Sequence, residues 1–214
     1  MAIELSYCVI NTERRPLLGY CLDAIARERA AVDFETETLV LDNASRDGSA
    51  GAAREHPATT ELIEADRRRS PHESASELLR RARGRFCLLL HEDSELEPGA
   101  TAALHAALTH ADDVAAAGAT LVNPDGAQQP SAWRFPSRWL RGRLVAQSRG
   151  HDIRAVDWAP TAALLVRREA AAAVGWLHPG EIEFCRRLHA AGWRVLYVPD
   201  ARAVAHVSPA VTHA

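Results

Sequence analysis

Apolar runs of strand length alternate with segments of helical periodicity along the first half of this chain. LSYCVIN (5–11) has the character of a buried strand, and PLLGYCLDAIARERAA (16–31) follows with apolar residues at helical spacing behind Pro16. Further strands and helices are expected at 38–41, 50–55, 61–65, 72–83 and 86–90. Strands that alternate with helices imply right-handed crossovers and a largely parallel sheet. We therefore predict an α/β fold.

The composition of the chain changes at about residue 123. Before this point a helix is expected from Pro98 to Ala107 and a strand at 114–122, whereas 128–152 is rich in Pro, Arg, Trp and Gly without a clear period, which is typical of a long functional loop. The later expected elements are a strand at AALLV, helices at RREAAAAV and EIEFCRRLHAAG, and a strand at RVLYV. Because 214 residues suit one substantial core, we interpret the change as one of role within a single domain.

Composition and charge narrow the classes of function. A net charge of −3 gives no electrostatic case for binding nucleic acid. The N-terminus lacks the pattern of a signal peptide, and no apolar segment approaches the roughly 20 residues that span a bilayer. The four cysteines have no C-x-x-C spacing, so we expect buried thiols rather than disulfides or a zinc site. The expectation is a soluble cytoplasmic protein.

Polar residues follow three of the expected strands at the point where each strand ends. These ends are Asn11-Thr12-Glu13, Asp42-Asn43 and Glu92-Asp93. Each group alone could cap a helix or lie in a solvated loop. Together they indicate a ligand site, because ligands of open parallel sheets bind outside the carboxyl ends of the strands. Adjacent acids suit Mg²⁺ or Mn²⁺, which proteins hold through one or two carboxylates plus substrate phosphates.

A further carboxylate lies at the start of the helix expected at EIEFCRRLHAAG. Glu181 is three and four residues before Phe184 and Cys185, so it shares their inward face. It could complement the helix dipole. The alternative is a general base that faces a cleft.

The motifs of the chain, in their order, resemble those of family 2 glycosyltransferases with the GT-A fold, from about residue 6 to 207. The matching segments are ETLVLDNASRDGSA, ARGRFCLLLHEDSELEPGAT, LVNPDG, QPSAWRFPS, VDWAPTAALLVRREAAAAVGW and EFCRRLHAAGWRVLYVPDARAVAH. The loop QPSAWRFPS looks most like the bacterial rhamnosyltransferase branch.

The resemblance implies an inverting enzyme that uses Mg²⁺ or Mn²⁺ to move a sugar from a nucleotide-diphosphate donor to an acceptor hydroxyl. It implies a single GT-A domain whose mostly parallel central sheet is flanked by helices, with residues 1–122 binding the nucleotide sugar and 123–214 binding the acceptor and carrying the catalytic residue. The donor would be a dTDP- or UDP-sugar, with rhamnose as the sugar of the resembling branch. A glycan, a lipid-linked glycan or a small molecule would serve as acceptor.

By the same resemblance, Thr12 and Asp42 fall where the family contacts the nucleobase and ribose, with Glu13 beside them in the donor site. Trp158 matches an aromatic residue that lines the sugar and acceptor pocket. Glu13 is a departure, because an aromatic residue is usual there.

The metal and the base are implied in the same way. Asp93 matches the metal-binding acid of a D-x-D-like motif, with Glu92 before it, and His206 falls at or one place beyond a histidine that completes the metal site. Glu181 aligns with the catalytic base. However, WLHPGEIEF is shorter than the usual stretch before the base, and a glutamate replaces the usual aspartate.

Two other classes remain open. The shortened stretch motivates a degenerate GT-A domain that binds nucleotide or acts as a scaffold without catalysis. An unrelated doubly wound protein, such as a phosphate-handling hydrolase, is disfavoured because no glycine-rich phosphate loop follows the first strand.

Two further segments allow more than one interpretation. The arginines of 67–69 and 80–85 could contact a diphosphate or lie on solvated surfaces. The loop at 133–143, with Trp133, Phe135 and Trp139, packs over the pocket or makes peripheral membrane contact.

Overall fold

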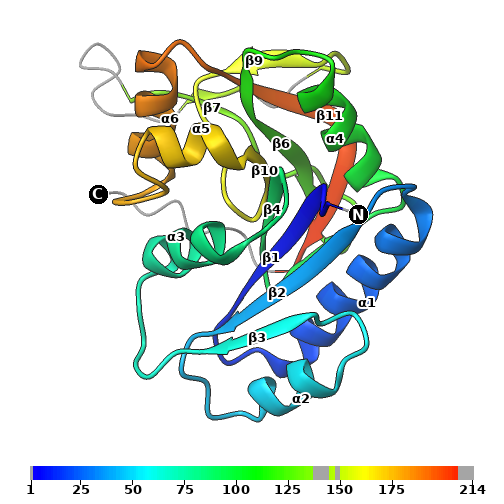
Figure 1. Ribbon diagram of the computed structural model, residues 1–214. Coiled ribbons are helices and arrows are strands. Elements are labelled where there is room, and N and C mark those ends of the chain that lie inside the picture. The colour runs from blue at the N-terminus through cyan, green and yellow to red at the C-terminus, as the bar shows by residue number, and fades with distance from the viewer. Residues whose placement is uncertain (1, 137–144, 148–149, 207–214) are drawn as a thin grey trace.

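The computed structural model describes residues 2–136, 145–147 and 150–206 (Figure 1). The helices are α1 (Arg15–Ala31), α2 (Ser49–Glu55), α3 (Pro71–Arg81), α4 (Ala100–Thr109), α5 (Arg168–Ala173) and α6 (Glu181–Ala190). The strands are β1 (Leu5–Asn11), β2 (Thr36–Asp42), β3 (Glu61–Glu64), β4 (Phe86–His91), β5 (Ser94–Leu96), β6 (Val114–Val122), β7 (Trp133–Arg134), β8 (Val145–Ala146), β9 (Arg154–Val156), β10 (Ala163–Arg167) and β11 (Arg194–Ala205).

A mixed sheet forms the centre of the molecule, in the order β3-β2-β1-β4-β10-β6-β11-β5, with β9 also paired to β11. The first four strands are parallel, as predicted, and β11 is parallel to β6. β10 is antiparallel to both β4 and β6, because it begins at the edge of the sheet where β6 ends. The prediction of a mostly parallel α/β sheet flanked by helices is confirmed, with antiparallel pairs at β5, β9 and β10.

Helices cover both faces of the sheet, and the alternation of side chains along β1 decides which face each residue serves. Leu5, Tyr7 and Val9 pack in a core with α1 and α4, whereas Cys8 and Ile10 pack in a second core with α3, α5 and α6. Figure 1 shows α1 and α3 on opposite sides of the strands. All four cysteines are buried and free.

The register of the parallel strands brings three of the predicted strand ends together. Asn11 is the partner of Asp42 across β1 and β2, and Ile10 is the partner of His91 across β1 and β4. The backbone N–H of Glu92 then bonds the carbonyl of Ile10 at 3.0 Å. The polar ends therefore lie along one edge of the sheet.

Some segments differ from the expectation, and others lie outside the described residues. The short strands β5, β7 and β8 were not expected from the sequence, and β7 pairs with β8 within the loop predicted at 128–152. Trp139 and the tail 207–214 lie outside the described residues. Among the helices that the structure describes, none is both long and apolar enough to cross a membrane.

Candidate functional site

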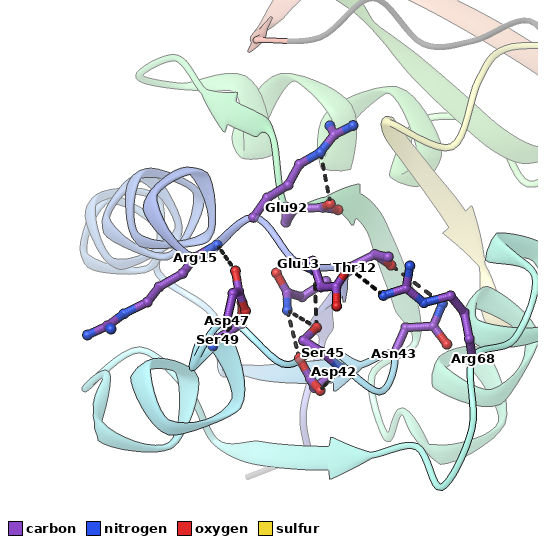
Figure 2. A network of polar contacts seen from close by, with 12 residues as sticks. Thr12, Glu13, Arg15, Asp42, Asn43, Ser45, Asp47, Ser49, Arg68 and Glu92 are labelled. Carbon is purple, nitrogen blue, oxygen red and sulfur yellow. Dashed lines mark hydrogen bonds and ion pairs between the residues drawn. The ribbon is translucent and has the colours of Figure 1, made fainter.

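The ends of β1 and β2 are joined by a buried carboxylate. Asp42 is 3 % exposed, and its Oδ1 accepts a hydrogen bond from the Asn11 amide at 2.7 Å. Its Oδ2 accepts the backbone N–H of Ser45 at 2.9 Å, and the Ser45 hydroxyl in turn accepts the second bond of the Asn11 amide (Figure 2). Asp42 therefore fixes the turn that follows β2, at the place where the resemblance puts the nucleobase and ribose.

Thr12, Glu13 and Asn43 connect these strand ends to the segment after β3. The Asn43 amide donates to the Thr12 hydroxyl at 3.4 Å and to the Arg69 carbonyl at 2.9 Å, and its own oxygen accepts the Arg69 N–H at 2.8 Å. The half-exposed Glu13 carboxylate lies 3.0 Å from the Arg68 guanidinium. Figure 2 shows the side chains of Glu13, Asn43 and Arg68 converging from three separate segments.

The acids after β4 form a buried pair that a single arginine contacts. Glu92 and Asp93 are 7 % and 6 % exposed. Arg14, which precedes α1, places its guanidinium 2.8 Å from the Asp93 carboxylate and 3.7 Å from that of Glu92. The pair is therefore partly neutralised by a residue 79 positions away in the sequence.

Burial raises the pKa of Glu92 to about 7, and the neighbouring Asp93 carboxylate adds to the rise. Arg14 and the backbone N–H groups of Glu92 and Thr12 oppose this shift without cancelling it. The approach of a cation would favour the charged form of such a carboxyl group.

His91 is the last residue of β4 and directly precedes the acid pair. Burial lowers the pKa of this imidazole, while the carboxylates of Asp93 and Glu181 both act to raise it. Its Nε2 is 3.2 Å from the Thr161 hydroxyl, which belongs to the segment that leads into β10. The charges of Asp93 and Glu181 therefore both act on this ring.

Glu181 is the first residue of α6, and its side chain is 24 % exposed. Its carboxylate lies 3.3 Å from Nδ1 of His72 at the start of α3, a contact with ion-pair distance but without the geometry of a hydrogen bond. Gly180 allows this approach, because a Cβ there would lie 3.3 Å from Nε2 of His72. The general base predicted from the sequence is thus half-buried and has a histidine beside it.

His206 follows β11 and is tied to the acid pair through the backbone, since its N–H donates to the Asp93 carbonyl at 3.0 Å. Its Nε2 is buried without a hydrogen bond and lies 3.5 Å from the Glu95 carboxylate. The described residues hold no preformed group of three metal-ligating side chains. The donor types nevertheless fit a hard cation that substrate phosphates would complete: a carboxylate at Asp93 and an imidazole nitrogen without a hydrogen bond at His206.

Trp158 is 3 % exposed and belongs to the hydrophobic core. Its ring stacks on that of Trp133 at 5.8 Å between centroids, and its Nε1 donates to the Arg134 carbonyl at 3.3 Å. The contribution of Trp158 in this structure is to hold β7 against the body of the domain.

Arg14 and His72 are site residues that the sequence analysis missed. Arg14 follows the predicted strand end Thr12-Glu13 directly, so proximity in sequence was the one available signal. His72 opens a helix that was predicted correctly, but its contact with Glu181 joins segments 109 residues apart, counted as 181 minus 72. Neither contact leaves a periodic pattern in the sequence.

Solved structures with the same arrangement of elements define the class of fold. A crystal structure of GalNAc-T7 with UDP, GalNAc and Mn²⁺ superposes with a TM-score of 0.74 at 13 % identity, over 95 % of this chain and 44 % of that one. A mannosyltransferase from Pyrobaculum calidifontis in complex with GDP-Man and Mn²⁺ gives 0.67 at 20 % identity, over 99 % and 59 %. The fold is therefore the GT-A fold of nucleotide-sugar transferases.

Residues 6–172 match the model of the family described as glycosyl transferase family 2, so the chain belongs to that family. It is 28 % identical over 143 residues to the N-acetylglucosaminyl-diphospho-decaprenol L-rhamnosyltransferase of Mycobacterium tuberculosis, in two strains. The match covers 56 % of this chain and 47 % of the relative, so the chain spans about half the length of the curated relatives that it matches.

Proposed function

We propose that the chain is an inverting, metal-dependent glycosyltransferase that moves a sugar from a nucleotide-diphosphate donor to an acceptor hydroxyl. The observation that carries the proposal is the buried pair Glu92-Asp93, which lies at the same sheet edge as Asp42. Burying carboxylates is unfavourable unless a cation or hydrogen bonds compensate them. A divalent cation with a diphosphate supplies that compensation.

The half of the domain formed by residues 1–122 would bind the donor. Asp42 and Thr12 would contact the nucleoside, with Glu13 at the rim, and Asp93 and His206 would hold Mg²⁺ or Mn²⁺ with Glu92 behind them. A bound cation of this kind stabilises negative charge on a departing diphosphate.

The half formed by residues 123–214 would bind the acceptor and supply the base, with Trp158 supporting the acceptor side. Glu181 would accept the proton of the attacking hydroxyl. An attack on the face of the sugar opposite the leaving group gives inversion. His72, at 3.3 Å from Glu181, would orient the carboxylate.

The name of the mycobacterial relative supports rhamnose as the sugar and a lipid-linked acceptor before a free glycan or a small molecule. A dTDP- or UDP-linked donor stays a prediction from the resemblance. A lipid-linked acceptor would bring a protein that is otherwise cytoplasmic to a membrane surface. The loop 133–143 is our candidate for that peripheral contact.

Isothermal titration of dTDP and UDP, with and without Mn²⁺, tests the proposal. We expect one nucleotide to bind with Mn²⁺ and the binding to weaken strongly without it. Asp93→Ala should remove the effect of Mn²⁺, whereas Asp125→Ala, in the exposed turn after β6, is a matched control that should not. Failure of both nucleotides to bind in the presence of Mn²⁺ would contradict the proposal.

One observation favours a second candidate, a nucleotide-binding domain without catalysis. Arg14 already contacts both acids after β4, so that charge compensation exists without a metal. If nucleotide binds normally but the donor sugar is neither transferred nor hydrolysed, this second function replaces the first.

A further inference from the structure

A hollow of about 270 Å³ beside α3 is lined mainly by positive charge. Its lining residues are Arg67, Arg69, Glu73, Ser76, Arg80 and His178. They come from the segment before α3, from α3 itself, and from the loop that leads into α6. The acid pair Glu92-Asp93 does not line it, so the hollow is distinct from the place proposed for the metal and the donor diphosphate.

Most of the hydrogen-bond donors of the three arginines are uncommitted. The guanidinium of Arg67 has no hydrogen bond or ion pair with another described residue, and only its backbone N–H bonds the Asp66 carboxylate. Arg69 reaches Asp66 at 3.3 Å, and Arg80 reaches Glu77 at 3.4 Å. Because a guanidinium carries five N–H donors in a fork that matches phosphate oxygens, each side chain can still bind an anion.

The one acid in the lining is already held by the chain. The Glu73 carboxylate accepts hydrogen bonds from the backbone N–H and the hydroxyl of Ser70, both at 2.9 Å. Together they form a capping box at the start of α3. The charge of Glu73 is therefore committed to the helix cap, and the remaining charge in the hollow favours an anion.

The face of α3 that lines the hollow also reaches the candidate base. His72, Ser76 and Arg80 are four residues apart and lie on one face of the helix. His72 contacts Glu181 at 3.3 Å, and the Ser76 hydroxyl accepts the N–H of Leu177 at 3.2 Å. Successive members of this face are separated by about 6 Å along the axis, which is comparable to the width of one sugar ring.

We propose that the hollow binds a phosphate or diphosphate group carried by the acceptor, so that the acceptor is a glycosyl phosphate rather than a neutral glycan. The inference rests on the proposed function, because it takes Glu181 as the base. A hydroxyl at Glu181 and a phosphate among Arg67, Arg69 and Arg80 are then the two ends of a single acceptor molecule. The donor diphosphate, the other source of the same chemistry, is bound at Asp93.

The double variant Arg67→Gln/Arg80→Gln tests the inference. The matched control Arg85→Gln/Arg194→Gln removes two exposed arginines at the opposite end of the strands, just before β4 and at the start of β11. Each protein is first titrated with UDP and dTDP in Mn²⁺, and then, with the bound nucleotide at saturation, with glucose 1-phosphate or with methyl glucoside. A protein that binds neither nucleotide is titrated with the two sugars directly.

We expect the wild type and the control to bind glucose 1-phosphate and not methyl glucoside. The double variant should bind glucose 1-phosphate at least about tenfold more weakly and keep its affinity for the nucleotide, because guanidinium–phosphate bonds are charge-assisted. Unchanged glucose 1-phosphate binding in the double variant overturns the inference, as does equal binding of methyl glucoside. A parallel loss of nucleotide affinity assigns the hollow to the donor and also overturns it. Absence of nucleotide binding in the first titration counts against the proposed function alone.

Discussion

Two buried glutamates lie at opposite ends of the parallel strands and have opposite pKa shifts. Glu37, the second residue of β2, is 2 % exposed, and Glu92, directly after β4, is 7 % exposed. Burial acts to raise the pKa of Glu37, but hydrogen bonds from the Arg83 backbone, the Ser6 hydroxyl and the Arg83 side chain outweigh it and hold this pKa below its usual value. Burial raises the pKa of Glu92 to about 7.

The difference suggests that the amino end of the sheet serves stability and the carboxyl end binds a ligand. The amino end closes on itself: Glu37 is fully bonded, and Gly84 donates to Ser6 at 2.9 Å in a space where a Cβ would meet Ser6 at 2.7 Å. The carboxyl end keeps one acid, Glu92, whose charge the chain compensates incompletely. Strongly shifted pKa values of this kind are typical of functional sites.

The largest expected effect is on catalysis and not on stability. Glu181→Gln should lower turnover by roughly 10²- to 10⁴-fold, because a general base contributes about that much. The melting temperature and the affinity for nucleotide should stay the same. Glu183→Gln, an exposed position in the same turn of α6, is the control and should keep its turnover. Full turnover in Glu181→Gln would show that the base is another residue.

The second effect is a gain of stability at high pH in the variant Glu92→Gln, which carries no charge at this position. Because the folded pKa is raised, the folded state binds more protons than the unfolded state between about pH 4.5 and 7, so the free energy of unfolding falls as the pH rises. At pH 8, the free energy of unfolding of Glu92→Gln should exceed that of the wild type by on the order of 3 kcal/mol. Urea unfolding at pH 4.5 and 8 measures it, and a difference independent of pH would refute this account of Glu92.

The amino end should respond in the opposite way. Glu37→Gln should lower the free energy of unfolding at pH 7 by about 1–3 kcal/mol, because Arg83 and Ser6 lose a charged acceptor. The pKa of Glu37 is lowered, so its stabilising contribution is present above the usual pKa of a glutamate and disappears as the pH falls through the folded value. The exposed Glu35→Gln is the control. Lost nucleotide affinity in folded Glu37→Gln would break the proposed separation.

The smallest effect concerns Arg14, which a cation at Asp93 must displace. Arg14→Gln should raise the affinity for Mn²⁺ by about tenfold, since breaking a charge-assisted hydrogen bond costs about 1.5–3 kcal/mol and Arg14 is partly exposed. Arg15→Gln is the control, because Figure 2 shows Arg15 directed away from Glu92. An unchanged affinity for Mn²⁺ would mean that the cation does not compete with Arg14.

The sequence predicts the parallel part of the fold well, because hydrophobic periodicity and polar strand ends are local signals. It predicts a strand at 162–166, close to β10, but not that this strand is antiparallel, because the direction depends on the edge of the sheet to which a long loop returns. The contacts of Arg14 with Asp93 and of His72 with Glu181 are set by packing between distant segments. The ring of Trp158 stacks on Trp133 in the structure, and the place that the family pattern gives it beside the sugar and acceptor stays a prediction.

Anomalous diffraction from a crystal soaked with Mn²⁺ and the nucleotide that binds is the most direct measurement. The account predicts one manganese peak within bonding distance of the Asp93 carboxylate and of a diphosphate oxygen, with the Arg14 guanidinium moved away. Nucleotide bound at the strand ends without manganese at Asp93, or manganese bound elsewhere, would contradict the claim that these acids hold a donor through a cation.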